Sequence, residues 1–453
     1  MRLFRLIGPL VALTACTDLT TPARPSAPLP PYRLTASEVW SGAEVRIISH
    51  APLPDTLPTV VLGAAAVAVV RLDDTTMLLD APRAVGAVPV QVIALEGSDA
   101  VGTLNVHGFD QIGTLFGVWG VLTQLPAVPA SVIGNGITGM AGVNLLTGTV
   151  TPYPDSMHSS DCDWGPGLTP EPGRFILEAP QAGCANASWQ VAPFLERFES
   201  APAFPSVGGA THRVIAQLGP GRWLVSEQND FTLWACADVC TNTSAGIPPD
   251  VPGQVDGIHL APSLGDRAAV DARSVAGATG VPVINTATAT VAYWEPSLAW
   301  SEGAAFSSGG DTLFIAGGDS TTGGHSWMFV LRASDGLVLD SVPLAVRPGD
   351  LALDPGGRWI YVSGQYASYH VGYWVVASGL EIVDRPTLRP VSVMLSDSLP
   401  APLSGASGSK YRLVLDPADR RGYVLRTDLY QVPDAANWPW TATTYLFGFS
   451  TPP

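Results

Sequence analysis

Residues 351–362, which read Leu351-Ala352-Leu353-Asp354-Pro355-Gly356-Gly357-Arg358-Trp359-Ile360-Tyr361-Val362, decide the fold of this 453-residue chain. The stretch holds a short apolar segment, an Asp-Pro-Gly-Gly turn and a second segment rich in aromatic and β-branched residues. Short segments of this composition on either side of a turn are typical of antiparallel β-strands. The stretch therefore predicts two consecutive strands joined by a tight turn.

The second strand of this motif, in which Gly-Arg precedes an aromatic and aliphatic run, recurs along the chain. Its further copies are GRFIL (173–177), GRWLV (221–225) and, more loosely, DTLFI (311–315) and RRGYV (420–424). A second unit reads as a strand, a small polar turn and a returning strand, and it occurs at 143–150, 283–291, 330–339 and 375–383. The two units together predict four strands in each repeat.

The repeat continues from about residue 106 to the end of the sequence. The last apolar residues of the expected first strands are Phe109, Leu168, Leu218, Leu260, Phe306, Leu353 and Leu415. Their spacings lie between 42 and 62 residues. Four-stranded units at such a period are the sequence mark of a β-propeller. Residues 106–453 are therefore predicted to form a propeller of about seven four-stranded blades, with six or eight blades left open.

The tetrapeptide Ile360-Tyr361-Val362-Ser363 resembles the Tyr-Val-Thr-Asn type of surface-layer propeller repeat, a family of exported bacterial proteins. This resemblance implies the propeller fold but no single function, because one propeller shape carries binders, scaffolds and enzymes. The last repeat shows three evident strands, so residues 101–106 are a candidate for the fourth strand that closes the ring. The alternative is that 101–106 form the last strand of the preceding domain.

Residues 32–105 form a series of short β-segments separated by turn residues. The expected strands are 43–48, 59–62, 66–72, 76–79, 88–95 and 102–106. Such a series suits an immunoglobulin-like sandwich, so the whole chain is predicted to be all-β: an Ig-like β-sandwich followed by the propeller. The runs SGAEVRI (41–47), VVLG (60–63), TMLLDAP (76–82) and GAVPVQV (86–92) resemble the IPT/TIG family of Ig-like domains. That resemblance implies a spacer or interaction module more often than a catalyst.

The N-terminus carries the pattern of an export signal. Two arginines and the apolar run 6–15 are followed directly by Cys16. The apolar run is too short to span a bilayer and has the layout of a cleavable secretory signal. The Leu-Thr-Ala-Cys ending resembles the lipobox of bacterial lipoproteins, which implies that residues 1–15 are removed and that Cys16 is lipidated. Residues 16–31 are rich in Pro, Thr and Ala and are expected to form an extended tether.

The composition is acidic and poor in charge. Charged residues make up 14% of the chain, with 23 Lys+Arg against 39 Asp+Glu, and the formal net charge is −16. Phosphate contacts need clustered cations, so this balance argues against nucleic acid or anionic lipid as a partner. No apolar run beyond residue 15 is long enough for a transmembrane helix. The lipid is therefore the expected membrane anchor, and Thr17 after the cysteine favours the outer membrane or the cell surface.

Four of the five cysteines remain if Cys16 is lipidated. An even number of cysteines in an exported protein favours disulfides, and sequence order suggests the pairs Cys162–Cys184 and Cys236–Cys240. Four cysteines allow three pairings in all. Free thiols and a metal site are the alternatives, but no histidine lies near Cys236 and Cys240 to support a metal.

No catalytic residue, metal ligand or cofactor is assigned from the motifs. Ser407-Gly408-Ser409-Lys410 fits the Ser-x-x-Lys nucleophile pattern, but it precedes a strand and lacks the companion motifs, which favours a loop. The seven histidines show no metal-ligand spacing. Asp161 and Asp163 flank a cysteine in a turn that lacks the further oxygen ligands of a calcium loop. These features favour structural roles.

Aromatic residues in loops are the better candidates for ligand contact. Trp438 and Trp440 lie in a Pro-bearing loop before the final strand, and Tyr366 and Tyr369 share a similar segment. Exposed aromatic rings of this kind are enriched at binding surfaces.

The sequence thus predicts a lipid-anchored cell-envelope protein whose propeller binds a protein, peptide or glycan partner without catalysis. The alternative is an exported propeller hydrolase, similar to a lactonase, with a metal in the central channel. A redox quinoprotein is a third option without a visible cofactor motif. An enzyme should gather several Asp, Glu, His or Asn side chains around one point of the channel.

Overall fold

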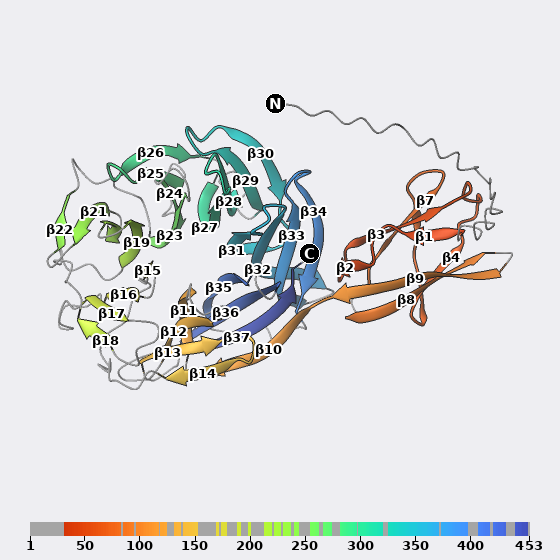
Figure 1. The fold of residues 1–453 in the computed structure, drawn as a ribbon, viewed down its shortest axis with the longest axis horizontal. Coiled ribbons are helices and arrows are strands. Elements are labelled where there is room, and N and C mark those ends of the chain that lie inside the picture. The colour runs from red at the N-terminus through yellow and green to blue at the C-terminus, as the bar shows by residue number, and fades with distance from the viewer. Residues whose placement is uncertain are drawn as a thin grey trace, which may run out of the picture.

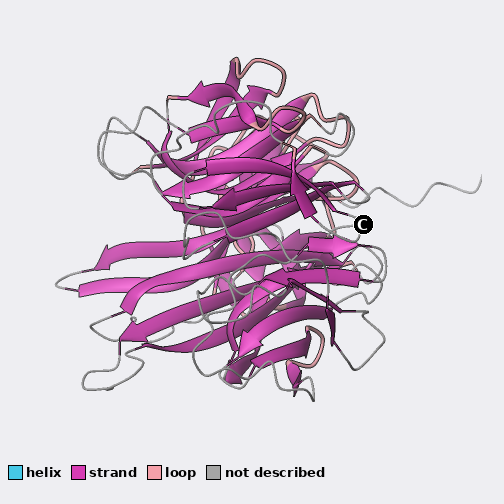
Figure 2. Cartoon of the chain, turned by 90° about the vertical axis from the view of Figure 1, so that its left-hand side faces the viewer, coloured by secondary structure: helices cyan, strands magenta, loops and turns pink. Residues whose placement is uncertain are grey.

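The structure is a computed structural model of the chain. It describes residues 31–82, 85–94, 97–116, 118–124, 131–136, 139–152, 169–171, 174–178, 188–191, 198–200, 213–219, 222–227, 230–236, 240–243, 254–261, 266–273, 281–296, 298–319, 325–370, 373–396, 406–416, 420–431 and 440–451. The predicted signal, tether and lipidated Cys16 lie outside these residues. In the described ranges every regular element is a β-strand, and Figure 2 shows strands and loops alone. A search of those same ranges finds no helix with the length and hydropathy needed to cross a membrane. The predicted all-β class is confirmed.

The first part of the fold is a two-sheet sandwich. One sheet has the strand order β1 (Tyr32–Leu34), β3 (Glu44–Ser49), β7 (Thr76–Asp80) and β6 (Val70–Arg71). The other has the order β2 (Glu38–Trp40), β9 (Gly97–His107), β8 (Gly86–Ala94), β4 (Thr59–Leu62) and β5 (Ala65–Val67). Alternate residues of β3 are buried, as a strand with one face on a core requires. Ile47 and Met77 of the first sheet pack with Val92 and Leu104 of the second in a single buried cluster.

The second part is a β-propeller built from consecutive four-stranded units. The first units are β11 (Val118–Gln124), β12 (Ser131–Gly136), β13 (Gly139–Asn144), β14 (Thr149–Pro152); β15 (Thr169–Glu171), β16 (Arg174–Glu178), β17 (Ser188–Val191), β18 (Phe198–Ser200); and β19 (Arg213–Gly219), β20 (Arg222–Glu227), β21 (Asp230–Cys236), β22 (Cys240–Asn242). The next are β23 (Gln254–Leu260), β24 (Arg267–Arg273), β25 (Val281–Asn285), β26 (Thr290–Glu295); and β27 (Leu298–Phe306), β28 (Thr312–Asp319), β29 (Ser326–Arg332), β30 (Val338–Pro343). These two join into one sheet through the pair Arg273 and Trp300. The last are β31 (Arg347–Leu353), β32 (Trp359–His370), β33 (Tyr373–Asp384), β34 (Arg389–Leu395); and β35 (Ala406–Asp416), β36 (Arg421–Gln431), β37 (Trp440–Ser450), which β10 (Phe109–Phe116) completes.

The units are arranged in a closed ring (Figure 1). The first strand of each unit contacts the first strand of the next, from β11 through β15, β19, β23, β27 and β31 to β35. Strand β35 in turn contacts β11. The first strands therefore surround the axis of the ring, and the last strand of each unit lies at its outer edge.

The ring is closed by a strand that follows directly on the sandwich. Strand β10 pairs antiparallel with β37, from Phe109 opposite Phe449 to Phe116 opposite Thr443. The hypothesis that residues 101–106 supply this strand is wrong, because they lie in β9 of the sandwich. The alternative, that they form the last strand of the preceding domain, matches this sheet.

The repeat pattern located most of the strands. The Gly-Arg runs begin second strands of the units, and Leu260, Phe306 and Leu353 end first strands as predicted. Phe109 instead begins the closing strand β10, and Leu168 lies outside the described residues, directly before β15.

The turn predicted within 375–383 does not exist. Strand β33 runs unbroken through this stretch and pairs with β32 along its whole length. Gly379 in this stretch lies under a neighbouring loop, because a Cβ there would come within 2.6 Å of Val346. A small-residue run marks a close approach here, as it does elsewhere in strands.

Candidate functional site

The turn after β2 joins the sandwich to the propeller. The N–H of Ser41 donates to the carbonyl of His107 (2.8 Å), and the N–H of Gly42 donates to that of Ala81 (3.2 Å). Gly42 has a φ of +75°, which glycine adopts without steric cost. The Trp-Ser-Gly sequence therefore forms a tight turn fixed to the ends of β9 and β7, with Trp40 at its start.

Trp40 anchors this turn on the propeller. Its side chain is 7% exposed and packs edge-to-face on Trp359, with ring centroids 5.1 Å apart. The indole Nε1–H donates to the carbonyl of Ser450 (3.2 Å), and the Ser392 hydroxyl donates to the carbonyl of Ser41 (2.8 Å). A buried aromatic ring with its polar atom satisfied contributes strongly to such a contact. The sandwich and the propeller are thus packed against each other at this point.

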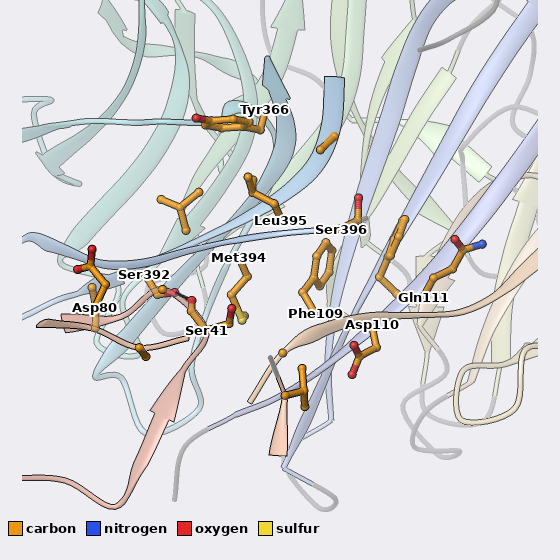
Figure 3. A pocket seen from close by; sticks show the side chains of 18 of the residues that line it. Ser41, Asp80, Phe109, Asp110, Gln111, Tyr366, Ser392, Met394, Leu395 and Ser396 are labelled. Atoms are coloured by element: carbon orange, nitrogen blue, oxygen red, sulfur yellow. Dashed lines mark hydrogen bonds between the residues drawn. The ribbon is translucent and has the colours of Figure 1, made fainter. Parts of the chain in front are cut away.

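A cavity of about 930 Å³ lies beside this junction. The sandwich and the connection to the propeller contribute Ser41, Gly42, Asp80, Ala81, Val85, Gly108, Phe109, Asp110 and Gln111. The propeller contributes Tyr366, Ala377, residues 390–396 and Phe447. Figure 3 shows Asp80 and Asp110 on either side of Ser41 and Met394, with Tyr366 across the hollow. The volume is that of a site for a small molecule or a short segment of a larger partner.

The lining of the cavity combines apolar surface with acidic and neutral polar groups. Phe109 and Phe447 stack 4.9 Å apart and form its buried part. The carboxylates of Asp80 and Asp110 are exposed, while Ser392 is buried. The described lining contains no lysine, arginine or histidine. Such a surface suits a partner that brings hydrogen-bond donors or positive charge.

A second group of ionisable side chains lies on two first strands and one second strand of the propeller units. The Nε2 atom of His259 in β23 is 2.9 Å from Oδ2 of Asp271 in β24, and Oδ1 of Asp271 accepts from the N–H of Gly303 (2.7 Å). Oδ2 of Asp350 in β31 accepts from the N–H of Leu413 (2.7 Å). These carboxylates connect neighbouring units of the propeller through backbone donors.

Burial and charge act in opposite directions on this second group. Burial disfavours the charged form of His259, but the carboxylate of Asp271 outweighs it and raises the pKa of the imidazole. Burial also opposes ionisation of Asp271, yet His259 and Arg412 hold the pKa of that carboxyl below its usual range. For Asp350 burial prevails, so its pKa is raised. His259 keeps 21% of its side chain exposed and is the accessible member. Within the described ranges, no three His, Cys, Asp or Glu side chains are placed to hold a metal ion.

The structure places one of the predicted ligand contacts in the cavity. Tyr366 lines it, whereas Tyr369 lies further along β32, opposite Trp374. Trp440 begins β37 and is described by its backbone alone, and Trp438 lies outside the described residues.

Of the two predicted disulfides, the pair Cys162–Cys184 lies outside the described residues. Cys236 in β21 and Cys240 in β22 are described by their backbone and lie directly opposite each other. Directly opposed residues of neighbouring strands are within the Cα separation that a disulfide needs. The pairing Cys236–Cys240 remains a prediction that this register supports.

Sequence reasoning missed Trp40, Asp80 and Asp110. Trp40 and Asp80 lie in or beside the runs that were assigned to the sandwich, and Asp110 follows the expected start of the propeller. No local pattern could show that these residues meet β34 and β37, which lie hundreds of residues later in the chain. An apolar tryptophan directly before a Ser-Gly turn was the available signal.

No family model matches the chain, and no curated protein matches it. Hydrazine synthase from Kuenenia stuttgartiensis has a similar structure, with 14% identity, 61% of this chain and 79% of that chain covered, and a TM-score of 0.44. A protein described as a 6-phosphogluconolactonase from Bacteroides fragilis has 13% identity over 71% and 92% of the two chains, with a TM-score of 0.42. A chain of a mitotic checkpoint complex has 11% identity over 70% and 85%, with a TM-score of 0.43. These likenesses concern the fold alone.

Proposed function

We propose that this protein is a lipid-anchored binding scaffold of the cell envelope and that the cavity beside Trp40 is its ligand site. In this proposal Cys16 carries the lipid, residues 16–31 are the tether, 32–105 are an IPT/TIG-like domain and 106–453 a propeller of about seven blades. The partner is an envelope protein, a peptide or a glycan, and binding involves no catalysis.

The observation that carries this proposal is the cavity between two packed bodies. A site at such a junction takes surface from both parts, and a prepacked site loses little conformational entropy when a ligand binds. The acidic surface of the chain supports a partner other than nucleic acid or anionic lipid, and the N-terminal pattern supports the location.

Site-specific photo-cross-linking tests this function. A photoreactive amino acid replaces Gln111, whose exposed side chain lines the cavity, and cells that carry the protein are irradiated. We expect a discrete cross-linked product that contains an envelope component. Ser98 is the matched control, because it is exposed on β9 at the end remote from β10 (Figure 1). Equal products at both positions, or none at Gln111, contradict the proposal.

The second candidate is a hydrolase that acts in the central channel. One observation favours it: His259 and Asp350 lie on first strands, which surround the axis of the ring, and interact electrostatically with each other and with Asp271. Metal analysis of the purified protein and a screen for hydrolysis of lactones and esters test this candidate. Turnover that His259→Ala abolishes would favour the hydrolase over the scaffold.

A further inference from the structure

Strand β34 has a free edge. It is the last strand of its sheet and, in the part of the chain that the structure describes, pairs on one side only, with β33. Just beyond β34, the N–H of Ser396 donates to the carbonyl of Ser378 in β33 (2.9 Å). Backbone groups of successive residues in a strand point to opposite sides, so those of Leu395 and Val393 point away from β33. The turn at Gly42 approaches this edge at one point, since a Cβ there would lie 3.7 Å from the Val393 carbonyl oxygen.

This edge faces the cavity. Seven consecutive residues, 390–396, line the cavity. Side chains alternate between the two faces of a strand, so a cavity on one face would be lined by every second residue. Here both sets of residues line the cavity: the buried residues Ser392 and Met394 and the half-buried residues Val393 and Leu395. The cavity therefore opens onto the unpaired backbone of β34 rather than onto one face of its sheet.

The lining of the cavity also carries two carboxylates. Asp80 at the end of β7 and Asp110 in β10 expose their carboxylates there, and the described lining supplies no cation to balance them. The whole chain has a formal net charge of −16, which adds to the attraction for a cationic partner. Charge complementarity of this kind selects a partner and steers its approach.

We propose that the cavity binds an extended peptide segment that adds to β34 as a further strand and places Lys or Arg side chains against Asp80 and Asp110. Strand addition uses main-chain hydrogen bonds for affinity and side-chain contacts for specificity. This inference rests on the proposed binding function and names the class of partner. The main-chain N–H and C=O groups of an extended peptide repeat at the spacing and in the directions of a strand edge, which the hydroxyl and acetamido groups of a glycan do not, so the free edge favours a peptide.

The first test compares three synthetic peptides by fluorescence anisotropy with the full protein. The probe is a capped peptide, about as long as the lining segment of β34, in which lysine alternates with threonine or valine. The second peptide carries N-methyl groups on alternate backbone amides, and the third has glutamate in place of lysine. We expect the probe to bind, and each altered peptide to bind at least about tenfold more weakly, which corresponds to about 1.4 kcal/mol. Equal binding of the N-methylated peptide overturns strand addition, and equal binding of the glutamate peptide overturns the charge argument.

The second test changes the protein. Leu395→Pro removes a backbone donor that points away from β33, whereas Leu395→Ala keeps it. We expect the proline variant to bind the probe at least about tenfold more weakly than the alanine variant, which truncates the same side chain but keeps the donor, after thermal unfolding has shown that both are folded. Asp80→Asn with Asp110→Asn should weaken binding of the lysine probe and flatten its salt dependence, even if the proline variant fails to fold.

The outcomes separate this inference from the function on which it rests. If no lysine peptide binds but position 111 still gives its cross-linked product, a cationic peptide is not the ligand of the cavity, and the proposed binding function stands. A glycan in that product would identify the other class of partner. If both the peptide and the cross-link fail, both proposals are wrong.

Discussion

Glu381 should make the stability of the propeller depend on pH. Its side chain lies in β33 and is 1% exposed. Its Oε2 accepts from the backbone N–H groups of Ala345 (2.7 Å) and Val346 (3.3 Å), which precede β31. Burial raises the pKa of this carboxyl to about 7, because it outweighs the two donors that favour the charged form.

The magnitude follows from the two pKa values. In the unfolded chain Glu381 has its ordinary pKa of 4.5, so between there and about 7 the folded protein holds a proton that the unfolded chain has released. Stability is therefore highest at low pH for this group, falls as the pH rises from about 4.5 to about 7, and is constant above. A rise of the pKa from 4.5 to about 7 corresponds to about 3 kcal/mol.

The variant Glu381→Gln isolates this effect. A glutamine oxygen can accept the same two hydrogen bonds, but the side chain does not ionise. Denaturant unfolding of both proteins, followed by tryptophan fluorescence from about pH 4 to about pH 8, gives the stability difference at each pH. We expect that difference to shift in favour of the variant by up to about 3 kcal/mol as the pH rises. Glu44→Gln, on the exposed face of β3, is the control for loss of a charge. A difference that is constant with pH, or that shifts the other way, refutes the reasoning.

Three further changes test other parts of the structure. Trp40→Ala should lower the free energy of unfolding by about 3–5 kcal/mol and raise hydrogen exchange in β2 and β34. Trp40→Phe should lower it by about 1 kcal/mol, because only the indole hydrogen bond is lost. Unchanged hydrogen exchange in the alanine variant would contradict the anchoring role of Trp40. Gly303→Ala should lower the thermal midpoint of unfolding far more than Gly309→Ala. The φ of Gly303 is +109°, and a Cβ there would lie 2.5 Å from the backbone N of Leu351. A Cβ on Gly309 would meet only the side chain of Asp311, at 3.5 Å. Cys16→Ser should abolish incorporation of labelled fatty acid and leave the precursor uncut, and normal processing would show that the lipobox interpretation is wrong.

The strands of this protein were predictable because their signals are local. Residues 59–62 are β4 as expected, and Leu260, Phe306 and Leu353 end their strands, since apolar runs and turn residues alternate there. The turn predicted within 375–383 was wrong because a Ser-Gly pair occurs both in turns and in strands that another segment approaches closely. Only the packing of Gly379 against Val346 distinguishes the two cases. The propeller architecture was accessible through the period of the repeats rather than through any one of them.

The cavity was not predictable because nearly every contact that forms it joins distant parts of the chain. Trp40 bonds to Ser450, and Ser41 accepts from Ser392. These contacts depend on how the ring closes: β9 ends at His107 and β10 begins at Phe109, so a single residue separates the sandwich from the strand that completes the last unit. That residue, Gly108, leaves no room for a Cβ, which would lie 2.2 Å from Val85. Such a short and tightly packed connection restricts where the sandwich can lie relative to the ring. The closing strand therefore fixes both the propeller and the position of its neighbour, and residues of β34 line one cavity with Asp80 and Asp110 as a consequence.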